Sequence, residues 1–275
     1  CHHPAVFACA LLNSQPMGFY APAQIVRDAQ AHDVEVRAAD VNASAWDNSL
    51  EDGALRLGLR QIDGFRESWA DQIVAARPFS SVEMLARKTS LPPRALRLLA
   101  DADAFRSINL DRREALWAVR RTPTDTLPLF AAADARELGI EPEVHLPIMP
   151  LAEHVVVDYQ TMCLSLKAHP MVLLRARFAA ENVLTCAQTS AVRNGARVKT
   201  AGIVLVRQRP GKGNAIFVTI EDETGITNIV IWARLFETVR RATMTARLML
   251  VEGTVQRSPE GVIHLMASCL HDRTS

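Results

Sequence analysis

The strongest constraint on the fold is a change in hydrophobic period near residue 196. From there to the end of the chain, hydrophobic and polar residues alternate with a period of two, which is typical of half-buried β-strands. Five segments alternate in this way: RVKTAGIVLVRQRP, AIFVTIED, TNIVIWA, RLMLVEGTVQR and VIHLMASCLHD. A helical segment, ARLFETVRRATMTA, lies between the third and the fourth. Five short strands and one helix within about eighty residues predict a small closed β-barrel.

The order β-β-β-α-β-β is the order of an OB-fold, and the residues before it have mostly helical patterns. The predicted fold class is therefore α+β and multidomain, with a helical region followed by a five-stranded OB-fold β-barrel. We divide the chain into a helical start, a helix-hairpin-helix region, a linker with connecting helices, and the OB-fold domain. The respective ranges are 1–54, 55–121, 122–195 and 196–275.

Within the helical region, two stretches alternate like short strands, residues 34–41 and residues 55–62. The sequence SSVE matches a capping box in which Ser80 accepts from the backbone and Glu83 reaches back. Residues 122–150 are rich in Pro and Ala with broken periodicity, which is typical of a connector between domains.

Composition describes an ordinary globular chain with 49% hydrophobic and 22% charged residues. Residues 1–195 hold 20 Lys and Arg against 23 Asp and Glu, whereas residues 196–275 hold 11 against 7. A basic C-terminal segment indicates a polyanionic partner. No hydrophobic run approaches the length of a membrane span, and the start lacks the pattern of a signal peptide. Five cysteines without a C-x-x-C pair are typical of reduced thiols, so we expect a cytoplasmic protein without membrane contact.

The start of the chain crowds possible metal ligands together, namely Cys1, His2, His3 and Cys9. Adjacent histidines point in different directions, and no second ligand pair follows at finger-like spacing. The pattern therefore favours a helix beginning at Pro4 over a zinc site. The expected hydrophobic stripe of that helix is Val6, Phe7, Ala10 and Leu11. The missing initiator Met suggests a piece of a longer chain.

A candidate DNA-binding motif lies at Ile62-Asp63-Gly64-Phe65-Arg66. In a helix-hairpin-helix, a Gly-rich turn directs backbone N–H groups at a duplex phosphate, which every nucleotide carries. We predict contacts from Ile62, Gly64 and Arg66. Arg66 stands where the motif usually has a second Gly. An arginine would be strained there at a positive φ, but its guanidinium adds a charge that pairs with phosphate. A plain helical turn remains the alternative. Residues 102–105 resemble a second copy, expected to be structural because Asp103 would repel DNA.

The barrel carries a second candidate site, for single-stranded nucleic acid. OB-fold strands present aromatic side chains for base stacking above a basic groove. The predicted contact residues are Arg207, Arg209, Lys212, Phe217 and Arg234. Alternation favours an exposed Phe217 and a buried Trp232, and the alternative places both rings in the core.

No residue of this segment is a candidate for catalysis. Asp101 and Asp103 form the only D-x-D, and two residues at that spacing on a helix diverge too far to share a metal. The carboxylates at 221–223 are expected in a solvated turn, and no nucleotide-binding loop, serine elbow or zincin motif is present.

Three stretches, together with the terminal barrel, resemble one family. They are HHPAVFACALLNSQPMGFYAPAQIVRDAQAHDVEVRAADVN, LRLGLRQIDGF and LSLKAHPM. They are similar to the C-terminal part of the bacterial error-prone DNA polymerase, a C-family enzyme like the alpha subunit of DNA polymerase III. The resemblance covers the whole chain and implies that residues 1–54 end the polymerase fingers. It also implies a DNA-directed DNA polymerase, a nucleotidyltransferase, of damage-induced mutagenesis and translesion synthesis.

The resemblance implies further that the catalytic palm precedes Cys1, so no catalytic residue is assigned here. Mg²⁺ is expected at that palm, and no cofactor is expected in this segment. Leu127, Leu129 and Phe130 resemble the peptide that binds the sliding clamp, although Thr126 replaces its leading Gln; an ordinary hydrophobic anchor is the alternative. Y-family-like and RecA-like accessory proteins are the other implied partners.

The sequence leaves three functions open. The first is a DNA-binding portion of the polymerase, gripping duplex at the hairpin and single strand at the barrel. The second is a protein-interaction module that docks accessory mutagenesis factors without binding DNA. A standalone single-strand-binding protein is the third, and the fingers-like start argues against it.

Overall fold

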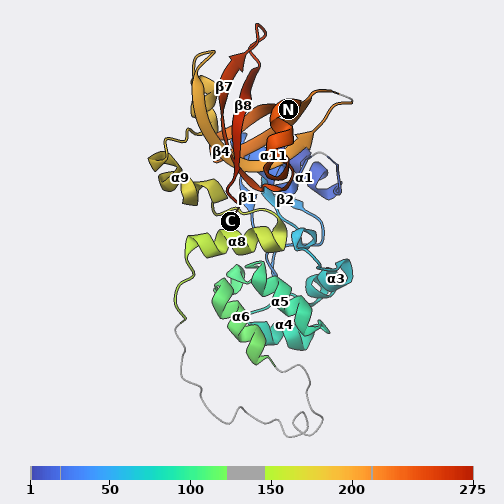
Figure 1. Ribbon diagram of the computed structural model, residues 1–275. Helices are drawn as coiled ribbons and strands as arrows, with labels where there is room; N and C mark the ends of the chain where they lie inside the picture. Colours follow the sequence, from blue (N-terminus) through green and yellow to red (C-terminus); the bar gives the residue numbers. More distant parts are fainter. Residues whose placement is uncertain (1, 19, 123–145, 212, 275) are drawn as a thin grey trace, which may run out of the picture. The chain divides into compact units, whose positions relative to one another are not determined.

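A computed structural model of the chain describes residues 2–18, 20–122, 146–211 and 213–274. The chain divides into two compact units, Cys1–Lys167 and Ala168–Ser275 (Figure 1). The helical region followed by a barrel is the predicted fold class, and it is confirmed.

The first unit contains helices and one small sheet in its described residues. Its α-helices are α1 (Pro4–Asn13), α2 (Pro22–Ala31), α3 (Glu67–Ala76), α4 (Val82–Lys88), α5 (Pro93–Asp101), α6 (Arg112–Arg121) and α8 (Leu151–Met162). The 3-10 helices are η1 (Leu59–Gln61) and η2 (Arg106–Ile108). The sheet has the order β1-β3-β2, formed by β1 (Val36–Arg37), β3 (Ala54–Arg56) and β2 (Ser49–Glu51).

Several local predictions for this unit need correction. Both expected strands are shorter: only Val36–Arg37 of the first stretch pairs with β3, and β3 (Ala54–Arg56), which also pairs with β2, includes only the first two residues of the second stretch. After β3 the chain passes close to the backbone of Trp46 at Gly58, where a Cβ would lie 2.3 Å from the carbonyl oxygen of Trp46. The residue that caps α4 is Ser81 rather than Ser80, and its Oγ accepts from Met84 N at 3.1 Å.

The hydrophobic stripe predicted for α1 is also wrong. Val6 and Phe7 are about half exposed, whereas Ala8 and Leu12 are buried. Helix α1 therefore packs on α2 and on the small sheet with a face rotated from the expected one.

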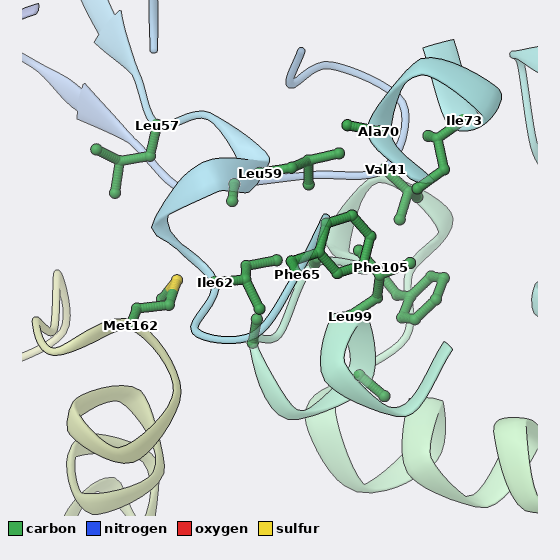
Figure 2. Close-up of a cluster of buried hydrophobic side chains, with 14 of the residues drawn as sticks. Val41, Leu57, Leu59, Ile62, Phe65, Ala70, Ile73, Leu99, Phe105 and Met162 are labelled. Atoms are coloured by element: carbon green, nitrogen blue, oxygen red, sulfur yellow. The ribbon is translucent and has the colours of Figure 1, made fainter. Parts of the chain in front are cut away.

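One hydrophobic core fills the first unit (Figure 2). Ile62 and Phe65, from the turn before α3, enter this core beside Leu59, Phe105 and Met162. The two anchors lie on either side of Asp63 and Gly64, which are exposed. The turn is thus fixed by burial at both ends while its tip faces solvent.

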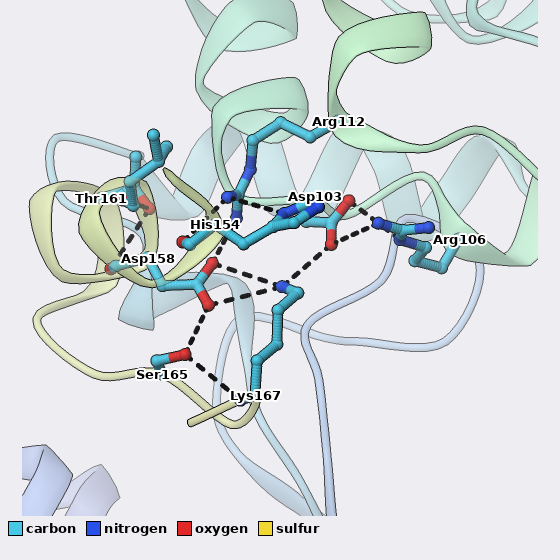
Figure 3. Close-up of polar contacts among 9 residues, drawn as sticks. Asp103, Arg106, Arg112, His154, Asp158, Thr161, Ser165 and Lys167 are labelled. Atoms are coloured by element: carbon cyan, nitrogen blue, oxygen red, sulfur yellow. Dashed lines mark hydrogen bonds and ion pairs between the residues drawn. The ribbon is translucent and has the colours of Figure 1, made fainter. Parts of the chain in front are cut away.

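A network of charged side chains joins α6, α8 and the second hairpin (Figure 3). Arg112 and Asp158 form an ion pair in which both side chains are 1% exposed. Arg112 also donates to His154 O at 3.0 Å, and Ser165 Oγ donates to Asp158 at 2.7 Å. Lys167 lies 3.4 Å from Asp158 and 3.0 Å from Asp103. These contacts attach α8 to the helices that precede it in the chain.

The second unit contains a closed five-stranded barrel with helices around it. Its strands are β4 (Arg197–Gln208), β5 (Ala215–Asp222), β6 (Gly225–Trp232), β7 (Leu248–Arg257) and β8 (Ile263–Asp272). Its helices are α9 (Pro170–Ala180), α10 (Cys186–Ala191) and α11 (Ala233–Thr245). The strand order β4-β5-β6-β8-β7, with α11 between the third and fourth strands, confirms the OB-fold prediction.

Both the inside and part of the outside of this barrel are packed. Its interior holds residues such as Val218, Ile229 and Leu265, and a second cluster joins Met171 and Phe178 of α9 to the outside of β4 and β7.

The acidic run at 221–223 is not solvated, contrary to expectation. Asp222 is 1% exposed and lies 2.8 Å from Arg175, which also pairs with Glu223. Asp222 further accepts from the backbone N–H of Cys186 at 2.8 Å. The run thus links the barrel to α9 and α10, a contact that local sequence does not reveal.

Among the described residues, Cys9, Cys163, Cys186 and Cys269 form no disulfide. Among the described residues, no helix combines the length and the hydrophobicity that crossing a bilayer requires.

We expect Asp158→Ala to lower the free energy of unfolding by about 3–5 kcal/mol, because it leaves Arg112 charged, buried and unpaired. Glu153→Ala, on the same helix, is the matched control, because its pair with Arg113 is 51% and 30% exposed and is worth at most about 1 kcal/mol. Urea denaturation followed by circular dichroism measures both. Equal losses in the two variants would contradict a dominant role for the buried pair.

Candidate nucleic-acid interface

The predicted hairpin forms a tight turn before α3. Gly64 has φ +73°, a left-handed conformation that favours glycine, and Phe65 N donates to Ile62 O at 3.1 Å. Arg66 has φ −121°, so replacing the second Gly costs no strain there. Ile62 is 1% exposed and its N–H donates to Leu59 O, so it anchors the turn and does not face a ligand. The prediction that Ile62 contacts DNA is therefore corrected.

Backbone N–H groups at this turn differ in their partners. Asp63 N donates to Thr161 O of α8 at 2.7 Å, and Phe65 N is used within the turn. In the described parts of the chain, no acceptor is found for the N–H groups of Gly64 and Arg66. They lie directly before the N-terminus of α3, where the helix dipole favours an anion. These two N–H groups can therefore donate to one phosphate oxygen or to a similar anion.

Two arginines flank the turn. The Arg66 guanidinium lies 5.0 Å from the ring centroid of Trp69. The Arg94 side chain reaches Gly64 from α5, since a Cβ at position 64 would lie 3.3 Å from Arg94 Nη2. Sequence reasoning did not identify Arg94 because thirty positions separate it from Gly64, although it begins a helix after the LPP signal.

In the second hairpin, the carboxylate of Asp103 is paired inside the protein. Asp103 pairs with Arg106 at 2.9 Å and with Lys167 at 3.0 Å. Burial raises the pKa of Asp103, but the hydrogen bonds and charges of Arg106 and Lys167 outweigh it and hold the pKa below its ordinary value. Its carboxylate is thus already satisfied within the protein.

An aromatic surface lies on the outside of β5 and β6. Phe217 is 37% exposed while its strand neighbours Ile216 and Val218 are buried, which confirms the predicted alternation. The Phe217 ring meets His264 of β8 edge to face, with centroids 6.4 Å apart. Trp232 is 52% exposed, and the expectation that it is buried is wrong. It ends β6 and caps α11, so it lies at the rim of the barrel wall, opposite Ala215.

Basic residues lie at the same end of the barrel. The β4–β5 turn is joined to α11 because Ala233 N donates to Asn214 O at 2.7 Å. Arg209 of this turn and Arg234 of α11 are exposed. Both belong to segments that meet where Trp232 ends β6. Lys212 falls outside the described residues.

Arg207 is not exposed beside these two arginines. The pairing of β4 with β5 shifts between Val204 and Val206, so that Leu205 is an extra residue, a β-bulge. The shift turns Arg207 to the side of its partner Val218, which faces the core. There Arg207 donates to the carbonyl oxygens of Thr243 at 2.6 Å and of Ala246. It caps the C-terminal end of α11, and burial lowers its pKa from the ordinary value.

Two other candidates have no structural description. Leu127, Leu129 and Phe130 lie outside the described residues, and so does Cys1. Where the structure is described, no group of three or more His, Cys, Asp or Glu side chains is arranged to hold a metal ion.

Two family models match this chain. Residues 33–115 match a helix-hairpin-helix motif, and residues 198–272 match an OB-fold nucleic acid binding domain. The chain thus combines a helix-hairpin-helix region with an OB-fold domain of the nucleic-acid-binding class.

Curated relatives are similar to this chain over its whole length. A protein of Rhodopseudomonas palustris (strain HaA2) named error-prone DNA polymerase is 59% identical, with 100% of this chain and 26% of the relative covered. One of Brucella abortus, with the same name, is 56% identical over the same shares. This chain corresponds to the C-terminal part of error-prone DNA polymerases. It spans about a quarter of the length of these relatives.

Among solved structures, asparaginyl-tRNA synthetase from Pyrococcus horikoshii is 26% identical, with a TM-score of 0.30. The match covers 33% of this chain and 22% of that one.

Gly64→Ala should lower the free energy of unfolding by about 1–2 kcal/mol, because alanine is strained at a positive φ. Gly64→Asn should cost less, since Asn tolerates this conformation. Gly18→Ala is the control, with no atom within 4 Å of the added Cβ. Thermal unfolding measures all three, and an unchanged transition in Gly64→Ala would contradict the described turn.

Proposed function

We propose that this segment binds DNA within an error-prone DNA polymerase that acts in the cytoplasm in damage-induced mutagenesis and translesion synthesis. The hairpin at Gly64 grips duplex, and the barrel holds the single-stranded template. The observation that carries the proposal is the exposed aromatic pair, Phe217 and Trp232, beside a basic turn on the outside of the barrel.

The barrel suits single strands because stacking needs accessible ring faces. Phe217 and Trp232 come from neighbouring strands and remain open to solvent on the outer side, while the barrel core is filled by other residues. Stacking on aromatic rings tolerates every base, and arginines nearby attract the backbone. Arg209 and Arg234 supply that charge.

The hairpin suits duplex because its contacts ignore base identity. Gly64 and Arg66 are exposed residues before α3 whose N–H groups have no acceptor within the described residues, and the phosphate is common to all nucleotides. A template that passes from duplex to single strand needs both kinds of contact.

Nucleotidyl transfer and the protein partners are proposed for the whole polymerase. Nucleotidyl transfer would take place in a palm outside this chain, with Mg²⁺ held there. The sliding clamp would bind Leu127, Leu129 and Phe130, and Y-family-like and RecA-like accessory proteins would be further partners.

Fluorescence anisotropy with single-stranded oligonucleotides tests the barrel. Phe217→Ala/Trp232→Ala should weaken binding by at least about 30-fold, because each of the two lost stacking platforms costs about 1–3 kcal/mol. The slope of log K against log salt should stay unchanged, since no charge is removed. Ile226→Ala removes another exposed hydrophobic side chain of β6, 53% exposed, and should bind like wild type.

The same measurement with duplex tests the hairpin. Arg66→Ala should make the salt slope shallower by about 0.9, the value for one duplex phosphate. A wild-type protein that binds neither form of DNA at low salt would contradict the proposal. The protein-docking function would then be the one to pursue.

A further inference from the structure

The hairpin by itself carries too little positive charge to attract DNA. Residues 63–67 include two carboxylates, Asp63 and Glu67, against one guanidinium, Arg66, and all three are exposed. Affinity for duplex comes largely from cations that neutralise phosphates and release counterions. If the hairpin binds duplex, further cations must lie beside it.

Helix α5 supplies two of them. Arg94 Nη2 lies against Gly64, as the 3.3 Å distance to a Cβ at that position shows. Arg94 is exposed and, within the described residues, forms no ion pair. Arg97 follows three positions later, on the same side of the helix, with its side chain 72% exposed. A line of positive charge thus begins at the hairpin and runs along α5.

The line continues onto α6, which packs against α5. Asp101 marks the crossing: Arg97 Nε lies 3.5 Å from its carboxylate, and the charge of Arg120 acts on the same carboxylate. Burial raises the pKa of Asp101 and outweighs Arg97, Arg112 and Arg120, which act to lower it. Asp101 is a single, partly buried carboxylate, and it does not balance the charges of both exposed arginines near it, Arg97 and Arg120.

We propose that Arg94, Arg97 and Arg120 form an arginine ridge that binds the phosphate backbone of the duplex held at Gly64. The inference rests on the proposed function of the hairpin. One turn of helix adds about 5 Å and a neighbouring helix about 8–10 Å. Because these two displacements are at right angles, the ridge lengthens the contact by about 10 Å, or roughly three base pairs at 3.4 Å each.

The test compares Arg97→Ala/Arg120→Ala with a charge-matched control. Anisotropy is measured with a duplex of about 20 base pairs over a series of salt concentrations. The ridge variant should have a salt slope shallower by about 1.8, the value for two phosphates. Arg193→Ala/Arg197→Ala removes two exposed arginines of the other unit and should keep the wild-type slope.

A second variant gives a gain that misfolding cannot imitate. Asp101→Asn removes the carboxylate from the ridge and releases Arg97, so duplex binding should become about two- to fivefold tighter at low salt. Thermal unfolding accompanies each variant, and Arg97→Gln/Arg120→Gln replaces the alanine pair if that pair unfolds.

The outcomes separate the ridge from the hairpin. Equal slopes in the ridge variant and its control overturn the ridge, and the hairpin function stands if Arg66→Ala still lowers the slope. Unchanged or weaker binding by Asp101→Asn also counts against the ridge. A wild-type protein without salt-dependent duplex binding overturns both proposals.

Discussion

The buried ion pair between Arg112 and Asp158 is the contact on which the first unit depends most. Two charges with side chains 1% exposed are stable together only if hydrogen bonds satisfy them, and the backbone of His154 and the hydroxyl of Ser165 do so. Because the pair fixes α8, the carbonyl of Thr161 is available to the N–H of Asp63. The conformation of the exposed turn thus depends on an interaction inside the protein (Figure 3).

The second unit depends on closure of the barrel, and a single bulge decides how its surface is used. Closure gives each strand one side that faces the barrel interior and one that faces outward. The extra residue Leu205 reverses which side chains face inward in the last part of β4. Arg207 consequently caps α11, while Arg209, beyond the strand, faces solvent. Two arginines only two positions apart therefore have different roles.

Under the proposed function, the two units present different chemistry for DNA. The first offers backbone N–H groups and guanidinium groups, which suit phosphates in a regular duplex. The second offers aromatic rings that suit unstacked bases. In both, the hydrophobic anchors are buried in the core while the proposed contact groups are exposed.

The sequence alone determined the barrel, its strand order and the position of the hairpin, because alternation, turn residues and a Gly at a positive φ are local properties. It also placed Phe217 correctly, since that residue lies in the middle of a regular strand. Trp232 and Arg207 could not be placed in this way, because a strand end and a bulge interrupt the period that the prediction uses.

Only the tertiary structure decided which charges are available to a ligand. Asp222 and Arg175, or Asp103 and Lys167, are distant in sequence and meet only after folding, so they look solvated in the sequence although they are paired. The reverse holds for Arg94, which is unremarkable on α5 until folding brings it to Gly64. Ion pairing depends on distances of a few ångströms in space, and the linear order of residues does not contain them.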